Sequence, residues 1–172
     1  MGDELPFYEK RIVYQVSGMG DVSVQRDLVY SNIGHVGLRM DVYLPKGLPD
    51  DMRVPGVVFI HGGPISADLP CPKDWQAFVS YGELVAASGL VGITFNHRFF
   101  SPDDLEQAAR DISAAIAYAR RRADTFHLDP ERLCLWAFSG GGDFLGPPLH
   151  EGHLLCVAWS LIMPSSTYAI WK

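Results

Sequence analysis

A serine followed by three glycines is the feature of this chain with the clearest chemical potential. Ser139 ends the apolar run Leu133–Phe138, and the glycines at 140–142 follow it directly. The stretch "AFSGG" is close to G-x-S-x-G, in which a serine sits on a sharp strand-to-helix turn, with Ala137 here in the first position. Such a turn needs small residues two positions away on either side. The pattern predicts Ser139 as a nucleophile.

A second glycine turn, "HGGP" at 61–64, follows another apolar run. Because Gly62 and Gly63 lack Cβ atoms, their N–H groups can approach a substrate oxygen closely. Together with the N-terminal amides of a helix expected to begin at Gly140, they would form an oxyanion hole, in which each donor typically contributes about 3 kcal/mol. Either turn alone also fits ordinary turn chemistry, and S-G-G-G fits a phosphate loop, although the P-loop lysine and the G-x-G-x-x-G spacing are absent. The combination is more specific than either turn.

The elements that would position these turns alternate along the chain. Apolar runs without alternation indicate strands buried on both faces of a parallel sheet, and the amphipathic stretches between them indicate crossover helices. We therefore expect one α/β domain over residues 1–172, with a mostly parallel sheet, helices on both faces and antiparallel strands at the N-terminus. The buried strands are expected at 55–63, 89–98, 133–138 and 154–163, the helices at 74–88 and 101–124, and the antiparallel strands, with one face wet, at 11–16, 22–30 and 38–44.

Composition limits the partners and the compartment. A net charge of −6 argues against nucleic acid or an anionic membrane as partner. The N-terminus lacks a signal-peptide pattern, and the longest apolar run, Leu154–Met163, is too short to span a bilayer. Cys134 and Cys156 lie in apolar runs and are expected to be small buried hydrophobes, so we expect a cytoplasmic protein. The histidines lack metal-ligand spacing such as H-E-x-x-H, so no metal or organic cofactor is expected.

From about Leu38 onward the chain resembles the α/β-hydrolases of the esterase/lipase type. "MDVYLP" is similar to the second strand of that family, "VVFIHGGP" to its third strand and oxyanion loop, and "GITFNHRF" to its fourth strand. "DISAAIAYARRRADTFHLDPERLCLWAFSGGG" is similar to its second helix, its Asp-Pro turn and its serine elbow. The resemblance implies a small-molecule carboxylic ester as substrate and Ser139 as the acyl-accepting nucleophile. It further implies an oxyanion hole of the Gly63 and Gly140 amides with Gly62, and a structural His61.

The acid and base of that family's triad are not evident. The family order is serine, then aspartate or glutamate, then histidine. After Ser139 the chain has only Asp143 and Glu151 as acids and His150 and His153 as bases. A helix continuing from the glycines would carry His150 about 15 Å away from Ser139. We therefore expect both histidines to be surface loop residues.

The chain resembles the N-terminal part of a hydrolase, ended after its sixth strand. The late strands of the family fold would then be missing, and Leu154–Met163 would be an open apolar edge able to pair with a second copy or a completing chain. This gives an alternative to a working esterase, which is a non-catalytic truncated remnant or an assembly module that pairs through its last strand.

Four further residues are candidates for a pocket. His97 ends the stretch "GITFNH", and in the family's strand order it would lie two strands, or about 10 Å, from the serine strand. A hydrogen-bonding or pocket-lining role therefore suits His97 better than the role of general base. Ile65, Trp75 and Phe99 would line a small apolar pocket, and each fits ordinary packing equally well.

Overall fold

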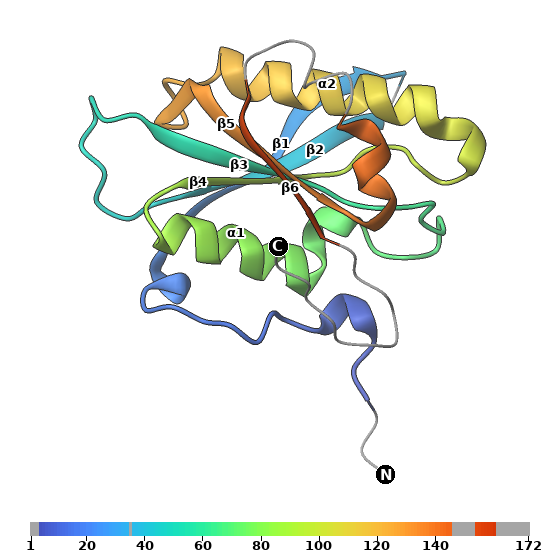
Figure 1. Cartoon of the computed structure of the whole chain (residues 1–172), viewed down its shortest axis with the longest axis horizontal. Helices are drawn as coiled ribbons and strands as arrows, with labels where there is room; N and C mark the ends of the chain where they lie inside the picture. Colours follow the sequence, from blue (N-terminus) through green and yellow to red (C-terminus); the bar gives the residue numbers. More distant parts are fainter. Residues whose placement is uncertain (1–3, 35, 146–153, 161–172) are drawn as a thin grey trace.

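The computed structural model describes residues 4–34, 36–145 and 154–160. They form a six-stranded mixed sheet with helix α1 on one face and helix α2 on the other (Figure 1). The strand order is β1-β2-β4-β3-β5-β6. The strands are β1 (Ser23–Ile33), β2 (Val36–Leu44), β3 (Val54–Ile60), β4 (Val91–Phe95), β5 (Leu128–Phe138) and β6 (Leu154–Ser160), and the helices are α1 (Gln76–Ala87) and α2 (Leu105–Arg121).

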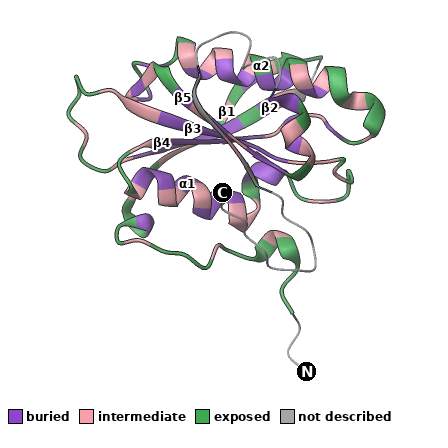
Figure 2. Cartoon of the chain, in the orientation of Figure 1, coloured by how far each residue is buried: buried purple, intermediate pink, exposed green. Residues whose placement is uncertain are grey.

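The sheet is parallel from β4 through β3 and β5 to β6, whereas β1 pairs with β2 and β2 with β4 in antiparallel fashion. All five residues of β4 and the last five of β3 are buried (Figure 2). A strand covered by helices on both faces needs apolar side chains in both directions, which explains the continuous apolar runs. The expected fold class, with its N-terminal antiparallel strands, is confirmed.

Helix α2 places its apolar stripe on the sheet. Ala108, Ile112, Ala115 and Ile116 are buried there in the larger of the core clusters. Ser101 begins this region as predicted, with a capping box around the short 3₁₀ turn η4 (Pro102–Asp104) that precedes α2. The opposite face carries a smaller cluster built from α1, β3 and β5, which includes the side chains of Phe59, Phe78, Val85 and Phe138.

The segment 11–16 differs from the prediction, because it forms no strand. It runs along α1, where the Arg11 guanidinium binds the Gln76 side chain at 3.2 Å and the Ile12 N–H donates to Ser80 Oγ at 3.1 Å. Val13 is 98% exposed. Of the β-branched residues that suggested a strand, Val13 projects into solvent while Ile12 and Val16 are half-buried, and contacts with a helix replace the partner strand.

The wet face expected for β2 is also wrong. Asp41 and Tyr43 belong to the polar half of the alternation, yet both are fully buried. A Cβ added at Gly82 of α1 would lie 2.5 Å from the Tyr43 ring, so the helix backbone packs directly on this side of the strand. The alternating pattern predicted the strand correctly. However, α1 covers the side of the strand that was expected to face solvent.

Two expectations near the C-terminal end are corrected or left open. The glycines open a six-residue 3₁₀ turn, η5 (Ser139–Phe144), and not a continuing helix, because consecutive glycines are poor helix formers. Cys134 is disulfide-bonded, so the prediction of a simple buried thiol is wrong for it. The predicted strand 154–163 is described as far as Ser160, where it forms the outer strand of the described sheet, and 161–163 lie outside the described residues.

Candidate active site

Ser139 stands at the carboxyl edge of the sheet in an unusual backbone conformation. It follows β5 directly and has φ +50°, in the left-handed region that side chains other than glycine seldom adopt. Ala137, two residues earlier, is fully buried in the sheet, while Ser139 itself is exposed. A non-glycine residue held at positive φ stores about 1–3 kcal/mol of strain, and such strain concentrates at functional sites.

The "HGGP" turn lies directly against this serine. Strands β3 and β5 are neighbours, with Ile60 paired to Ala137, so both turns leave the sheet at the same place. A Cβ added at Gly62 would lie 3.0 Å from Ser139 Cβ and 3.2 Å from the Gly140 nitrogen. The two turns can approach this closely only because Gly62 has no side chain.

The close approach extends to the other two glycines of the predicted site. A Cβ added at Gly140 would lie 2.8 Å from the Gly63 carbonyl oxygen, and one added at Gly63 would lie 2.5 Å from the Phe99 ring. The structure thus brings Ser139, Gly62, Gly63 and Gly140 together from two separate segments of the chain.

Beneath the glycine turn, His61 and His97 form a stacked pair. Their ring centroids are 3.6 Å apart and the ring planes differ by 4°. His61 Nδ1 lies 2.7 Å from the Gly62 carbonyl oxygen, and His97 Nε2 lies 3.1 Å from the carbonyl oxygen of His61. The His97 backbone N–H donates to His61 Nε2 at 3.4 Å. Both side chains are buried and both bind the loop that carries the glycines.

Burial keeps this pair neutral. It lowers the pKa of His61 to about 4, against an ordinary value of 6.5. Burial, and then the neighbouring His61, lowers the pKa of His97 well below 6.5. The strand order places β3 between β4, which leads to His97, and β5, which leads to Ser139, as predicted. His97 is therefore placed to hydrogen-bond the backbone of the glycine loop.

The other candidate pocket residues divide into two groups. Phe99 packs against Gly63, and the Ile65 N–H donates to the Phe99 carbonyl at 2.8 Å, so both belong to the neighbourhood of the loop. Trp75 packs against the core cluster that contains Phe78 and Phe138. Its Nε1–H donates to the Pro70 carbonyl at 2.7 Å, and its ring meets Phe7 edge to face at 5.0 Å.

Phe144 is a neighbour that the sequence did not single out. Its ring lies 5.5 Å from the His97 ring and 5.2 Å from the Phe99 ring, and it is buried. Phe144 comes five residues after Ser139. An apolar residue at the end of the glycine turn is the one feature of the sequence that could have indicated it.

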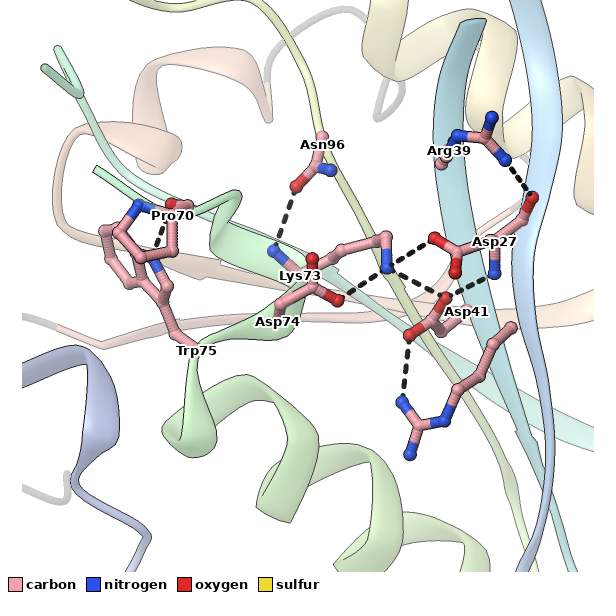
Figure 3. Close-up of polar contacts among 9 residues, drawn as sticks. Asp27, Arg39, Asp41, Pro70, Lys73, Asp74, Trp75 and Asn96 are labelled. Carbon is pink, nitrogen blue, oxygen red and sulfur yellow. Dashed lines mark hydrogen bonds and ion pairs between the residues drawn. The ribbon is translucent and has the colours of Figure 1, made fainter. Parts of the chain in front are cut away.

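A buried ion cluster lies beside the end of β4 and was also missed (Figure 3). Lys73, in the 3₁₀ turn η3 (Pro72–Asp74), is only 4% exposed, and its ammonium lies 2.6 Å from Asp74, 3.0 Å from Asp27 and 3.2 Å from Asp41. Its backbone N–H donates to the Asn96 side chain at 2.9 Å. The hydrogen bond from Lys73 lowers the pKa of Asp27. The cluster therefore attaches η3 to β1, to β2 and to the residue before His97.

The sheet order, with helices on both faces and the serine turn and glycine loop on adjacent strands, defines an α/β-hydrolase fold of the esterase type. The chain belongs to the BD-FAE family, whose model matches residues 40–145. The matched region runs from β2 to η5 and includes both glycine turns and Ser139. Comparison with curated proteins gives no match.

Solved structures of esterases share the fold. Thermogutta terrifontis esterase 2 phosphorylated by paraoxon matches with a TM-score of 0.58 and 23% identity over 73% of this chain and 46% of that one. The butyrate-bound form of that enzyme gives 0.58 and 24% over 73% and 43%. A truncated form of a carbohydrate esterase from gut microbiota gives 0.57 and 25% over 71% and 41%. The chain thus spans less than half the length of each of these esterases.

In the described part of the chain, no helix is both long and apolar enough to cross a membrane. Among the same residues, no group of three or more histidine, cysteine, aspartate or glutamate side chains is placed to hold a metal ion.

Proposed function

We propose that this chain carries the nucleophile and the oxyanion-binding groups of a serine hydrolase that acts on small-molecule carboxylic esters. The observation that carries the proposal is Ser139 at φ +50° at the end of β5, with Gly62 packed against it. A strained serine on a strand-to-helix turn is exposed for attack, and adjacent backbone amides suit the negative charge that then develops.

In the proposed reaction, Ser139 Oγ attacks the ester carbonyl carbon and gives up its proton to a base. The carbonyl oxygen becomes an oxyanion, which accepts hydrogen bonds from the Gly63 and Gly140 amides with the Gly62 amide beside them. The intermediate collapses, the C–O bond to the alcohol breaks, and the alcohol leaves with a proton. Water then attacks the carbonyl carbon of the acyl-serine and gives a proton to the base; the C–Oγ bond breaks, Ser139 Oγ takes the proton back, and the carboxylic acid leaves.

The proposal gives neither His61 nor His97 the role of general base. Both bind the loop backbone, and His97 is separated from the serine strand by β3. His150 and His153 lie outside the described residues. The continuing helix that was expected to carry His150 away from Ser139 does not form within 139–145, where the 3₁₀ turn ends at Phe144.

The ester class is supported by the neighbours. One is named an esterase and is described with butyrate bound, and another is named a carbohydrate esterase. Within this chain, the apolar Phe99 lies against Gly63 of the glycine loop and packs on Phe144, beside the place where the acyl group of an ester would be held. Both features support a small acyl group.

The test is hydrolysis of p-nitrophenyl butyrate by the full chain. Ser139→Ala is expected to lower the rate at least about 10³-fold, because nucleophilic catalysis is lost. Ser88→Ala is the matched control, since Ser88 is exposed and bonds only its own helix, and its rate is expected to stay unchanged. Labelling by paraoxon, read by mass spectrometry as one diethylphosphoryl group on Ser139, gives a second readout. Equal rates for wild type and Ser139→Ala would remove Ser139 from the mechanism.

A further inference from the structure

The four residues after β4 are each fixed by a different part of the molecule. The Asn96 side chain accepts from the Lys73 N–H, and its carbonyl accepts from Tyr30 Oη at 2.6 Å. Arg98 binds Asp111 through its backbone N–H at 3.0 Å and through two guanidinium nitrogens at 2.8 and 2.7 Å. His97 stands between these two anchored neighbours, so its ring position is determined on both sides.

The glycine loop rests on this segment at two points. The Ile65 N–H donates to the Phe99 carbonyl, and the Phe99 ring fills the space where Gly63 would carry a side chain. The second point is the stacked pair of His61 and His97. The segment after β4 therefore contacts the glycine loop both near its start, at His61, and near its end, at Gly63 and Ile65.

The hydrogen bonds within the pair assign both tautomers. His61 Nε2 accepts from the His97 backbone N–H, so the proton of His61 is on Nδ1, which donates to the Gly62 carbonyl. His97 Nε2 faces the carbonyl oxygen of His61, so the proton of His97 is on Nε2. The remaining nitrogen, His97 Nδ1, is buried and has no hydrogen-bond partner within the described residues. Each ring is therefore neutral and has one defined donor.

The two carbonyls that accept these bonds belong to the peptides that hold the amides of the proposed oxyanion hole. In a planar trans peptide, the carbonyl of one residue and the N–H of the next point in opposite directions. Holding the His61 carbonyl down therefore turns the Gly62 N–H away from the pair, and holding the Gly62 carbonyl down does the same for the Gly63 N–H. Both amides are then presented on the side of the loop away from the histidines.

We infer that His97 is a positioning residue, which orients the Gly62 amide by holding the His61 carbonyl. It acts beside His61, the structural histidine that the resemblance implies, which holds the Gly62 carbonyl and with it the Gly63 amide. The catalytic consequence of this inference rests on the proposed function, but the geometry does not. The two histidines act together as one support, since His97 also holds the His61 ring through its backbone N–H.

The first experiment tests the geometry without any reaction. Long-range proton–nitrogen spectra of the full chain labelled with nitrogen-15, recorded at pH 7, are expected to show His61 as the Nδ1–H tautomer and His97 as the Nε2–H tautomer. Reversed tautomers, or either ring titrating at its ordinary pKa, would overturn the inference and leave the proposed function standing.

The second experiment separates the hydrogen bond from the ring. His97→Gln keeps a donor in place of Nε2, whereas His97→Phe keeps an apolar ring and removes the donor. We expect His97→Phe to shift the Gly62 amide resonance and to lower kcat on p-nitrophenyl butyrate about 10- to 100-fold with KM little changed, and His97→Gln to stay within about 3-fold of wild type. His127→Asn is the control, because His127 lies beside the start of β3, where its carbonyl accepts from Val54 N–H.

The outcomes distinguish the two proposals. Equal loss in His97→Phe and His97→Gln would contradict positioning through the Nε2 donor. If His97→Phe fails to fold, the tautomers of the wild type and the near-normal kcat of His97→Gln still decide the question. If Ser139→Ala hydrolyses the ester as fast as wild type, the proposed function fails, while the tautomers and the Gly62 resonance continue to test the support of the loop.

Discussion

Asn96 and His97 are consecutive residues, yet they belong to two buried polar clusters of opposite kind. Asn96 binds the cluster in which Lys73 meets three carboxylates (Figure 3). His97 belongs to the neutral pair with His61. Both clusters lie at the carboxyl end of β4, and both attach a loop to the sheet. The histidine pair is buried, whereas in the charged cluster Lys73 and Asp41 are buried and the carboxylates of Asp27 and Asp74 reach the surface.

The Lys73 cluster and the histidine pair show two ways of accommodating polar groups inside the protein. The Lys73 cluster keeps its charges, and burial is tolerated because opposite charges lie within hydrogen-bond distance. The histidine pair avoids charge altogether, and its bonds depend on each ring keeping a single proton. One cluster should therefore fail when a partner is removed, and the other when a proton is added.

The largest effect is expected from Lys73→Met. Within the described residues, removing the ammonium leaves the fully buried Asp41 with only the half-exposed Arg26, at 3.2 Å, and the Asp27 N–H, at 2.8 Å, as partners. Breaking a buried pair by removing one partner typically costs about 3–5 kcal/mol. The free energy of unfolding, measured in urea, should fall by that amount. Lys46→Met is the matched control, because Lys46 is 75% exposed and lies 3.9 Å from Asp21, and it should change stability by less than about 0.5 kcal/mol. A loss below about 1 kcal/mol at Lys73 would contradict this account of the cluster.

The next effect separates the clusters by pH. The pKa of His61 is about 4 in the folded chain and 6.5 ordinarily, so the unfolded chain takes up the proton first as the pH falls. Stability from this ring is complete above pH 6.5 and is lost as the pH falls through 4, by roughly 3 kcal/mol. Asp27, with its pKa lowered from 3.8, loses its contribution only below that range.

Unfolding in urea at several pH values between 4 and 7 measures this effect. Phe95 and Phe144 face the pair, and the adjacent Arg98 is paired with Asp111, so the histidines themselves should dominate the slope. His61→Asn keeps a donor near the Gly62 carbonyl but does not titrate, and its stability should vary less over this range. The same slope in both proteins would count against a neutral, buried His61.

The smallest effect is expected at the edge of the charged cluster. Trp75→Phe keeps an aromatic ring against Phe7 and loses the hydrogen bond from Nε1 to the Pro70 carbonyl. One such bond contributes about 1 kcal/mol, so the urea midpoint should fall slightly. Tyr14→Phe, on a side chain that is 69% exposed, is the control and should leave the midpoint unchanged. A change at Trp75 as large as that at Lys73 would mean that the cluster extends further than its ion pairs.

The sequence predicts the sheet well where the signal is local. A continuous apolar run such as that in β4 can be buried on both faces in only a few ways, and the capping residues at Ser101 act within one turn. The positions of Ser139, Gly62 and Gly63 follow from the same logic, since glycine turns after buried strands meet at the carboxyl edge.

What the sequence missed is nonlocal. Asp41 looks like a solvent-facing residue until Lys73, 32 residues later, is placed beside it by η3. The partner of His61 is likewise 36 residues away. The segment 11–16 has strand-like residues, but whether it pairs with a strand or lies on α1 is decided by packing, which the local pattern does not contain.

The proposed oxyanion site is made of main chain, and this has a consequence for how the protein can evolve. Gly62, Gly63 and Gly140 meet because they lack side chains, so a substitution other than proline keeps their N–H groups and acts by crowding them. Drift in the surrounding side chains can thus retune the acceptable acyl or alcohol group while the amides remain. We therefore expect the oxyanion-binding amides of this chain to be kept in evolution longer than the side chains around them.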